Sequence, residues 1–293
     1  MTHVVPPRPA SVGLRRLARG CWIPTAHVDD LAARCTAALE TSAEYTIVVS
    51  TTAARLHGFW LPDLPDVIHL ATAAPSIASS SMTRTRRSEF RAHRRQLPDE
   101  DLTTMGGLVL STPARTWRDL AGVLDLPSLV AAGDSVLRAG TSIDELADVV
   151  SRTPRARYVR SARRAVPLLD ARSRSRPESH LRVAVSAPDL PRFEVNTAVS
   201  RSTGGWLAEP DLSIAAAKLA LEYQGADHVE LRRMRRDLTR NTDMRREGWL
   251  CCLYGPAEVF ARPWEITAEV RAALARRAPH LLTPRHRPRA GCS

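Results

Sequence analysis

Hydrophobic positions recur along this chain at two spacings, and each spacing predicts a different kind of element. In residues 29–43, Leu31, Cys35, Ala38 and Leu39 follow the three- and four-residue intervals of an amphipathic helix. Short apolar runs instead predict buried strands, because a strand needs only a few consecutive apolar residues. By these criteria we expect strands at residues 45–49, 67–71 and 108–110, and helices at residues 51–58, 126–138 and 143–150 and from Pro113 onward.

The last third of the chain predicts the element order αβββαβα. We expect a helix at residues 177–187, strands at 193–199, 208–215 and 218–223, a helix at 229–247, a strand at 249–254 and a helix at 264–277. The predicted fold class is α/β of the α+β kind, with a C-terminal αβββαβ domain preceded by a smaller mixed α/β domain. The expected limits are a disordered N-terminus at 1–13, the first domain at 14–150, a basic linker or helix at 151–172, the second domain at 173–278 and a flexible tail at 279–293.

Composition adds a strong positive charge to this picture. The 293 residues carry a formal net charge of +11 with a pI near 10.5, and arginine supplies nearly all of it, since Lys218 is the only lysine. A GC-rich genome would explain arginine in place of lysine, but it would not explain the surplus of positive over negative charge. Because the arginine fork suits phosphate, we expect nucleic acid as a partner, and DNA in particular.

Arginines cluster in two places that are candidate phosphate contacts. Six lie within residues 84–95, where Glu89 is the one acid, and a second run occupies residues 152–174. The first run can also be a solvated charged loop, whereas a phosphate-contacting patch would supply sequence-independent affinity. On the expected helix 229–247, Arg240 can instead form an ion pair with Asp237, which lies one turn earlier. The candidate DNA contacts are Arg84, Arg86, Arg87, Arg91, Arg94, Arg95, Arg236 and Arg240.

Cysteine spacing and hydropathy exclude several classes of protein. The five cysteines are odd in number and show no CxxC spacing, so we expect neither a zinc site nor a disulfide framework. No apolar run approaches membrane-spanning length, and the first residues contain no apolar signal segment. We therefore expect a cytoplasmic protein without a membrane partner.

Two acids fall on neighbouring predicted strands of the second domain. Asp211 lies on the strand at 208–215 and Glu222 on the strand at 218–223, where alternation places Glu222 and Gln224 on one face. An Asp followed by an acid-x-Lys strand is the pattern of metal-dependent nucleases, and two such carboxylates can ligate Mg²⁺ or Mn²⁺. The metal would polarise a phosphodiester and lower the pKa of a bound water. We therefore expect Asp211 and Glu222 to be metal ligands of a catalytic site.

Three further residues join the candidate catalytic set, and each has an alternative. Gln224 stands where the nuclease pattern has lysine, and a glutamine cannot carry that charge. His228 can act as a general base or acid, although a single His after a strand can also be a plain loop residue. Glu178 can reach the metal through water, or it can be the N3 acid of a capping box opened by Ser175.

With these residues in view, the last third resembles the very-short-patch-repair type (Vsr-like) endonuclease domain. The resemblance covers about residues 170–275. It rests on residues 175–179, 209–212, 221–225 and 236–240, with His228 and the pair Gly248 and Trp249. It implies the restriction-endonuclease-like fold of the Asp…(Asp/Glu)-x-Lys superfamily, with Asp211 and Glu222 on the metal and Glu178 and His228 as accessory residues.

The first half is similar to the non-catalytic part of abortive-infection (AbiEi-type) antitoxins. The similarity rests on residues 15–24, whose basic and then apolar run is like the β-wing of a winged helix, and on residues 52–58 and 111–120. It implies a scaffold or DNA-binding module rather than an enzyme, together with a toxin–antitoxin or defence-system partner.

Three functions are therefore open at this point. The first is a Mg²⁺-dependent DNA endonuclease acting in repair or defence, which rests on the paired strand acids. The second is a catalytically inactive DNA-binding or regulatory protein that keeps the nuclease fold, which Gln224 and the arginine runs motivate. The third is a protein-interaction component of a defence or toxin–antitoxin locus.

Overall fold

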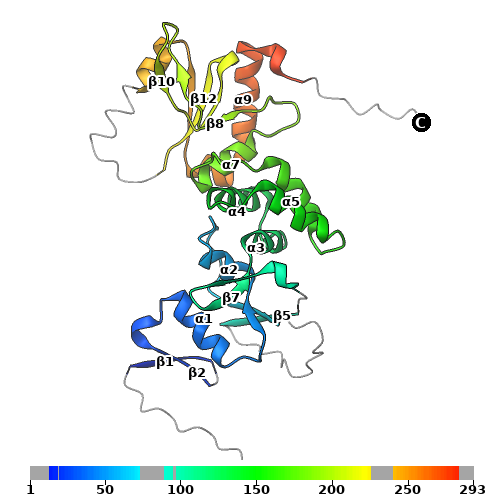
Figure 1. Ribbon diagram of the computed structural model, residues 1–293. Helices are drawn as coiled ribbons and strands as arrows, with labels where there is room; N and C mark the ends of the chain where they lie inside the picture. The colour runs from blue at the N-terminus through cyan, green and yellow to red at the C-terminus, as the bar shows by residue number, and fades with distance from the viewer. Residues whose placement is uncertain (1–12, 19, 73–88, 95–96, 226–239, 284–293) are drawn as a thin grey trace, which may run out of the picture. The chain divides into compact units, whose positions relative to one another are not determined.

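The computed structural model describes residues 13–18, 20–72, 89–94, 97–225 and 240–283 of the chain (Figure 1). Contacts divide the chain into two compact units. The first unit comprises Met1–Phe59 and Asp63–Leu120, and the second comprises Trp60–Pro62 and Ala121–Ser293. The domain limit expected near residue 172 lies inside the second unit, and the expected disordered N-terminus and tail lie largely outside the described residues.

The first unit contains a five-stranded mixed sheet and a separate hairpin. Its elements are β1 (Leu14–Ala18), β2 (Cys21–Pro24), α1 (Leu31–Glu40), β3 (Thr46–Val48), α2 (Ser50–Leu56), β4 (Ile68–Thr72), β5 (Phe90–Arg94), β6 (Leu102–Met105), β7 (Leu108–Ser111) and α3 (Pro113–Leu120). The sheet order is β5-β4-β3-β7-β6, and β1 pairs with β2. Asp30 caps α1 by accepting hydrogen bonds from two backbone N–H groups, and Cys35 of that helix packs against Val48 and Leu110 of the sheet.

Two strands of this sheet have no counterpart in the sequence prediction. Phe90–Arg94 forms β5 where a basic loop was expected, and Leu102–Met105 forms β6, which has no apolar run. Both are edge strands of the sheet. Edge strands carry polar and charged side chains because one of their sides faces away from the other strands, so hydrophobic patterning does not reveal them.

The second unit begins with helices and continues into a four-stranded sheet. Its helices are α4 (Leu126–Arg138), α5 (Ile143–Arg152), α6 (Val159–Ala165), α7 (Arg176–Ala184) and α9 (Pro263–Arg277). Its strands are β8 (Glu194–Val195), β9 (Val199–Ser200), β10 (Trp206–Ala208), β11 (Leu212–Ile214), β12 (Leu219–Tyr223) and β13 (Leu250–Tyr254). Short 3-10 turns lie at Val166–Leu168, Ala215–Ala217 and Pro279–Leu281, and a π-helical turn, η5, at Ala257–Ala261.

The sheet order in this unit is β13-β12-β11-β8, with a β9–β10 hairpin beside it. Strands β8, β11 and β12 are antiparallel, and β13 runs parallel to β12 after a segment whose residues 240–246 are helical. The strands of the four-stranded sheet follow the expected order αβββαβα, whereas the β9–β10 hairpin adds two strands that were not expected separately. The α+β class is confirmed. Of the helix expected at 229–247, the first eleven residues lie outside the described part of the chain.

Two apolar clusters cover the two faces of this sheet. Leu221 of β12 shares one cluster with Leu181 of α7 and Ile266 of α9. Ala220, the neighbouring strand residue, instead joins Trp249 in the second cluster. The alternation of β12 thus assigns each of its side chains to one face.

A buried ion pair joins α4 to α7. Arg182 donates to the Asp134 carboxylate, and the two residues are 7% and 0% exposed. Asp134 also accepts from the Ser179 hydroxyl at 2.6 Å and from the Asp170 backbone N–H at 2.8 Å. Burial raises the pKa of Asp134, and these donors oppose the rise, so the network offsets part of the cost of burying the charge.

The helices that the structure describes include none that is both long and apolar enough to cross a membrane.

We expect Asp134→Ala to lower the free energy of unfolding by about 3 to 5 kcal/mol, because it leaves the Arg182 charge buried without its partner. Chemical denaturation measures this loss. Asp148→Ala is the matched control, since its ion pair with Arg152 is exposed and we expect a change of no more than about 1 kcal/mol. Equal losses in the two variants would contradict a special role for the buried pair.

Candidate functional site

The two predicted strand acids lie opposite each other in the sheet. The antiparallel register of β11 and β12 pairs Leu212 with Leu221. Continued by one residue, this register places Asp211 opposite Glu222. Directly opposed residues of antiparallel strands share one face, so both carboxylates belong to the face of β12 that carries Ala220.

Asp211 is held by the backbone of the neighbouring strand. Its carboxylate accepts a hydrogen bond from the Tyr223 N–H at 2.8 Å. Burial raises the pKa of Asp211 from 3.8 to about 7, and the negative charges of Glu178 and Glu222 add to the rise, while the Tyr223 N–H and Arg240 oppose it. A buried carboxyl beside two other acids is the kind of perturbed group found at functional sites.

Glu222 is buried and forms an ion pair with Arg240, whose Nη2 lies 2.5 Å from the carboxylate. Arg240 belongs to the helical residues 240–246, which precede β13. From the sequence, Arg240 was expected to be either a DNA contact or the ion-pair partner of Asp237. In the structure Arg240 brings a positive charge to the acid pair, and Asp237 lies outside the described residues.

Glu178 lies in the first turn of α7, and its negative charge acts on Asp211 of the acid pair. Ser175 is the N-cap of α7, and its hydroxyl lies 2.9 Å from Oε1 of Glu178. The other oxygen, Oε2, accepts from the Arg174 N–H and the Asn196 side-chain amide, both at 2.8 Å. The backbone N–H that Glu178 accepts from belongs to Arg174 and not to the N-cap residue Ser175, so this contact differs from the expected capping box.

Other predicted site residues are placed differently or lie outside the described residues. Gln224 is exposed, and its backbone N–H donates to the Tyr254 carbonyl. Arg91 is an exposed residue of β5, and the backbone of Arg94 ends that strand. The candidates outside the described part of the chain are Arg84, Arg86, Arg87, Arg95, His228 and Arg236.

Within the described ranges, no three His, Cys, Asp or Glu side chains form a cluster that could hold a metal ion. The acid pair, with Glu178 nearby, is therefore a two-carboxylate site at most among these residues. Mg²⁺ accepts so few protein ligands because it keeps most of its water, so two carboxylates match its chemistry.

Sequence reasoning missed Asn196, which joins Glu178 to the chain after β8. Its amide also donates to the Arg172 carbonyl at 2.8 Å, and its backbone has a φ of 45°. Asparagine tolerates this left-handed conformation better than most residues. An Asn that follows a short strand was the available signal, but it did not identify Glu178 as the partner.

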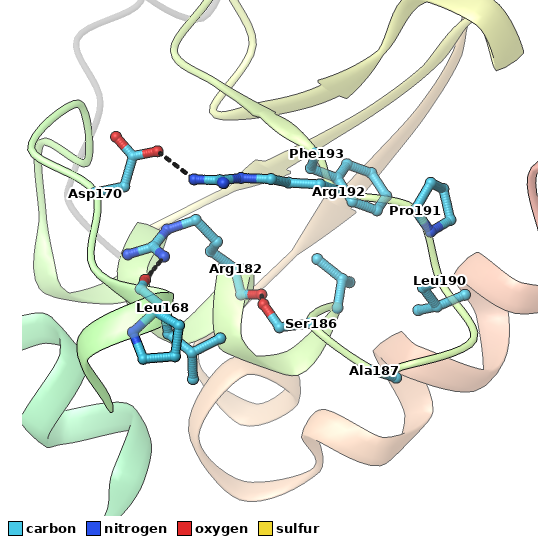
Figure 2. Close-up of a pocket in the computed structure, with 11 residues that line it drawn as sticks. Leu168, Asp170, Arg182, Ser186, Ala187, Leu190, Pro191, Arg192 and Phe193 are labelled. Atoms are coloured by element: carbon cyan, nitrogen blue, oxygen red, sulfur yellow. Dashed lines mark hydrogen bonds and ion pairs between the residues drawn. The ribbon is translucent and has the colours of Figure 1, made fainter. Parts of the chain in front are cut away.

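A separate cavity of about 200 Å³ lies between the end of α7 and the residues before β8 (Figure 2). Figure 2 shows Arg182 reaching the Leu168 carbonyl and Arg192 reaching Asp170 at 4.0 Å. Arg192 thus pairs with Asp170, and Arg182 pairs with Asp134 behind the cavity wall. None of the predicted site residues lines the cavity. We assign no function to this cavity.

Comparison with protein families gives one match. The family described as the AbiEi antitoxin C-terminal domain matches residues 46–171, which is less than half of the chain. The match supports the expected similarity of the first half to antitoxins, including residues 52–58 and 111–120, and it extends through α6 of the second unit. None of the curated proteins matches the chain, and none of the solved structures does. The resemblance of residues 170–275 to Vsr-like endonucleases stays a prediction.

We expect Asp211→Asn to stabilise the protein at about pH 8 and to change its stability little at about pH 4. The folded protein holds the Asp211 proton more tightly than the unfolded chain, since its pKa is about 7 instead of 3.8. Wild-type stability therefore falls as pH rises through this interval, and the amide variant escapes that loss. Each unit of difference between the folded and unfolded pKa values of Asp211 corresponds to about 1.4 kcal/mol of folding free energy before solvent screening.

Urea denaturation of both proteins at the two pH values measures the effect. Glu209→Gln is the matched control, because Glu209 is a nearby acid that already pairs with Arg174. If Asp211→Asn is equally or less stable than wild type at the higher pH, burial does not destabilise the ionised form of Asp211.

Proposed function

We propose that this chain is a DNA-binding regulatory protein of the antitoxin type. The observation that carries the proposal is the match of residues 46–171 to the AbiEi antitoxin C-terminal domain. The net charge of +11 supports DNA as the partner, because phosphate neutralisation supplies most of the sequence-independent affinity for DNA. A cognate toxin is the protein partner that this similarity suggests.

An exposed arginine surface within the matched segment supports the DNA-binding role. The surface consists of five arginines whose side chains are exposed and that belong to no ion pair that the structure describes. They are Arg155, Arg157, Arg160, Arg163 and Arg164. We call this set the α6 arginine surface. No acid interrupts residues 152–164, so the charges are not offset along the chain. Such a surface fits a phosphate backbone, because its guanidinium groups are exposed and no acid within the run offsets them.

Tyr158 fixes the start of the α6 arginine surface. Its backbone is left-handed, with a φ of 63°, and the Arg157 guanidinium lies 4.8 Å from its ring centroid. The ring packs over Gly122, where an added Cβ would come within 2.6 Å of the ring. Only a residue without a side chain leaves room for the ring at that position.

A second candidate function is metal-dependent phosphodiester hydrolysis, and the facing carboxylates of Asp211 and Glu222 favour it. These two residues would hold Mg²⁺ or Mn²⁺, which polarises a phosphate and generates a nucleophilic water at neutral pH. Asp211 would be deprotonated on binding the cation, because the added positive charge lowers its pKa. Glu178 would orient the site from the start of α7.

Arg240 is the main obstacle to a cation at this pair. It already supplies the positive charge that Glu222 requires, and a cation at the same carboxylate would compete with it. Gln224 also supplies no charge in place of the lysine of the nuclease pattern. Because of these two features, DNA-binding regulation is better supported than phosphodiester cleavage.

We expect the protein to bind duplex DNA with an affinity that falls steeply as salt rises. Replacing Arg160, Arg163 and Arg164 together with serine is expected to reduce the slope of log affinity against log salt by up to about 2.7, which is about 0.9 per lost phosphate contact. Fluorescence anisotropy at several salt concentrations measures the slope. Arg262→Ser is the control, since Arg262 pairs with Glu258 and Glu265. An unchanged slope in the triple variant would remove the α6 arginine surface from the interface.

Calorimetric titration with Mg²⁺ and Mn²⁺ tests the second candidate function. We expect heat of binding in wild type, its loss in Asp211→Asn, and a stronger signal in Arg240→Gln, because the competing charge is gone. Glu209→Gln again serves as the control. The same four proteins incubated with DNA and Mn²⁺ report cleavage, and binding without cleavage would support a site that has lost turnover. Absence of heat in both wild type and Arg240→Gln would exclude a metal at this pair.

A further inference from the structure

Phe260 presents an exposed aromatic ring beside the end of β12. Its side chain is 39% exposed on the π-helical turn η5, and the Tyr223 ring lies edge-on to it at 6.4 Å. From α7, the Arg176 guanidinium lies over the Phe260 ring at 4.8 Å, and the His180 ring meets it edge-on at 4.9 Å. We call Phe260, Tyr223, Arg176 and His180 the Phe260 cluster.

Two polar atoms of the Phe260 cluster are buried, and neither has a hydrogen-bond partner among the described residues. They are Nε2 of His180 and Nε of Arg176. The His180 side chain is only 7% exposed, and burial, with the Arg176 charge, lowers its pKa to about 4. A neutral imidazole nitrogen without a partner normally costs free energy, so its presence beside an exposed ring points to a missing ligand atom.

We propose that the Phe260 cluster is a subsite for an unpaired nucleobase of DNA, a proposal that rests on the DNA binding proposed above. A nucleobase offers a flat π face for Phe260, polar edge atoms for His180 and an attached phosphate for Arg176. An aliphatic ligand would use the ring alone, and an inorganic anion would use the arginine alone. Only a group that combines a ring, a polar edge and a negative charge uses all three side chains.

The Phe260 cluster lies at the same end of β12 as the acid pair, but on the opposite face of the sheet. Tyr223 contributes its ring to the Phe260 cluster and its backbone N–H to Asp211. Helix α7 likewise carries Arg176 and His180 on one side and Glu178 next to Asp211. Glu222 and Tyr223 are successive residues of β12, so the two sites lie on opposite faces at one end of that strand. A base in the subsite would therefore belong to a nucleotide near, but not at, the acid pair.

The test compares DNA strands with and without bases. Fluorescence anisotropy would measure binding of a short single-stranded oligonucleotide of mixed sequence, an abasic strand of the same length and the matching blunt duplex. We expect wild type to prefer the base-bearing strand over the abasic strand. Phe260→Leu keeps apolar volume but removes the π face, and we expect it to weaken binding of the base-bearing strand by roughly 5- to 100-fold. Phe260→Tyr is expected to retain the preference.

Trp206→Ala is the matched control, because Trp206 is an aromatic residue of the same unit that is 62% exposed and lies outside the Phe260 cluster. We expect it to bind all three probes like wild type, and thermal melting confirms that each variant is folded. Unchanged binding of the base-bearing strand by Phe260→Leu would overturn the subsite while leaving the proposed DNA binding intact. Wild type that binds none of the probes at low salt would overturn both.

Discussion

The buried Asp134–Arg182 pair is the constraint on which the second unit depends. It fastens α4, which lies within the antitoxin-matched segment, to α7, which lies beyond that segment. Helix α7 then supplies Glu178 at its first turn and Leu181 to the core under the sheet. A buried charge tolerates little displacement of its partner, so this contact sets where the start of α7 meets β11 and β12. The position of the acid pair relative to Glu178 follows from it.

The acid pair is stabilised mainly by groups that the fold brings from a distance. Tyr223 donates a backbone N–H to Asp211, Arg240 compensates Glu222, and Asn196 donates to Glu178. Glu222 thus has a charged guanidinium donor, whereas the donors to Asp211 and Glu178 are uncharged. Burial is the main reason that the pKa of Asp211 is raised, and the single backbone N–H of Tyr223 offsets only part of that rise.

The sequence predicted elements wherever pattern and capping agree. The limits of α4 were predicted at both ends, because its apolar period is regular and Asp125 caps it. That Asp211 and Glu222 lie on the same face of the sheet could be predicted from the alternation of side chains along adjacent strands. The edge strands β5 and β6 were not, since their polar residues resemble a loop. Arg240 could not be assigned to Glu222, because a charge on a helix gives no sign of which distant acid it will reach.

The ring of Tyr158 over Gly122 has a consequence for variation in this protein. A methyl group at position 122 would meet the ring at 2.6 Å, and the ring is the far end of a side chain whose own backbone is already left-handed. Substitution at this glycine would therefore act at a distance of 36 positions along the chain, by turning the ring outward and releasing the guanidinium of Arg157 from it. A change at a single small residue could in this way alter how a basic surface is presented without altering its composition.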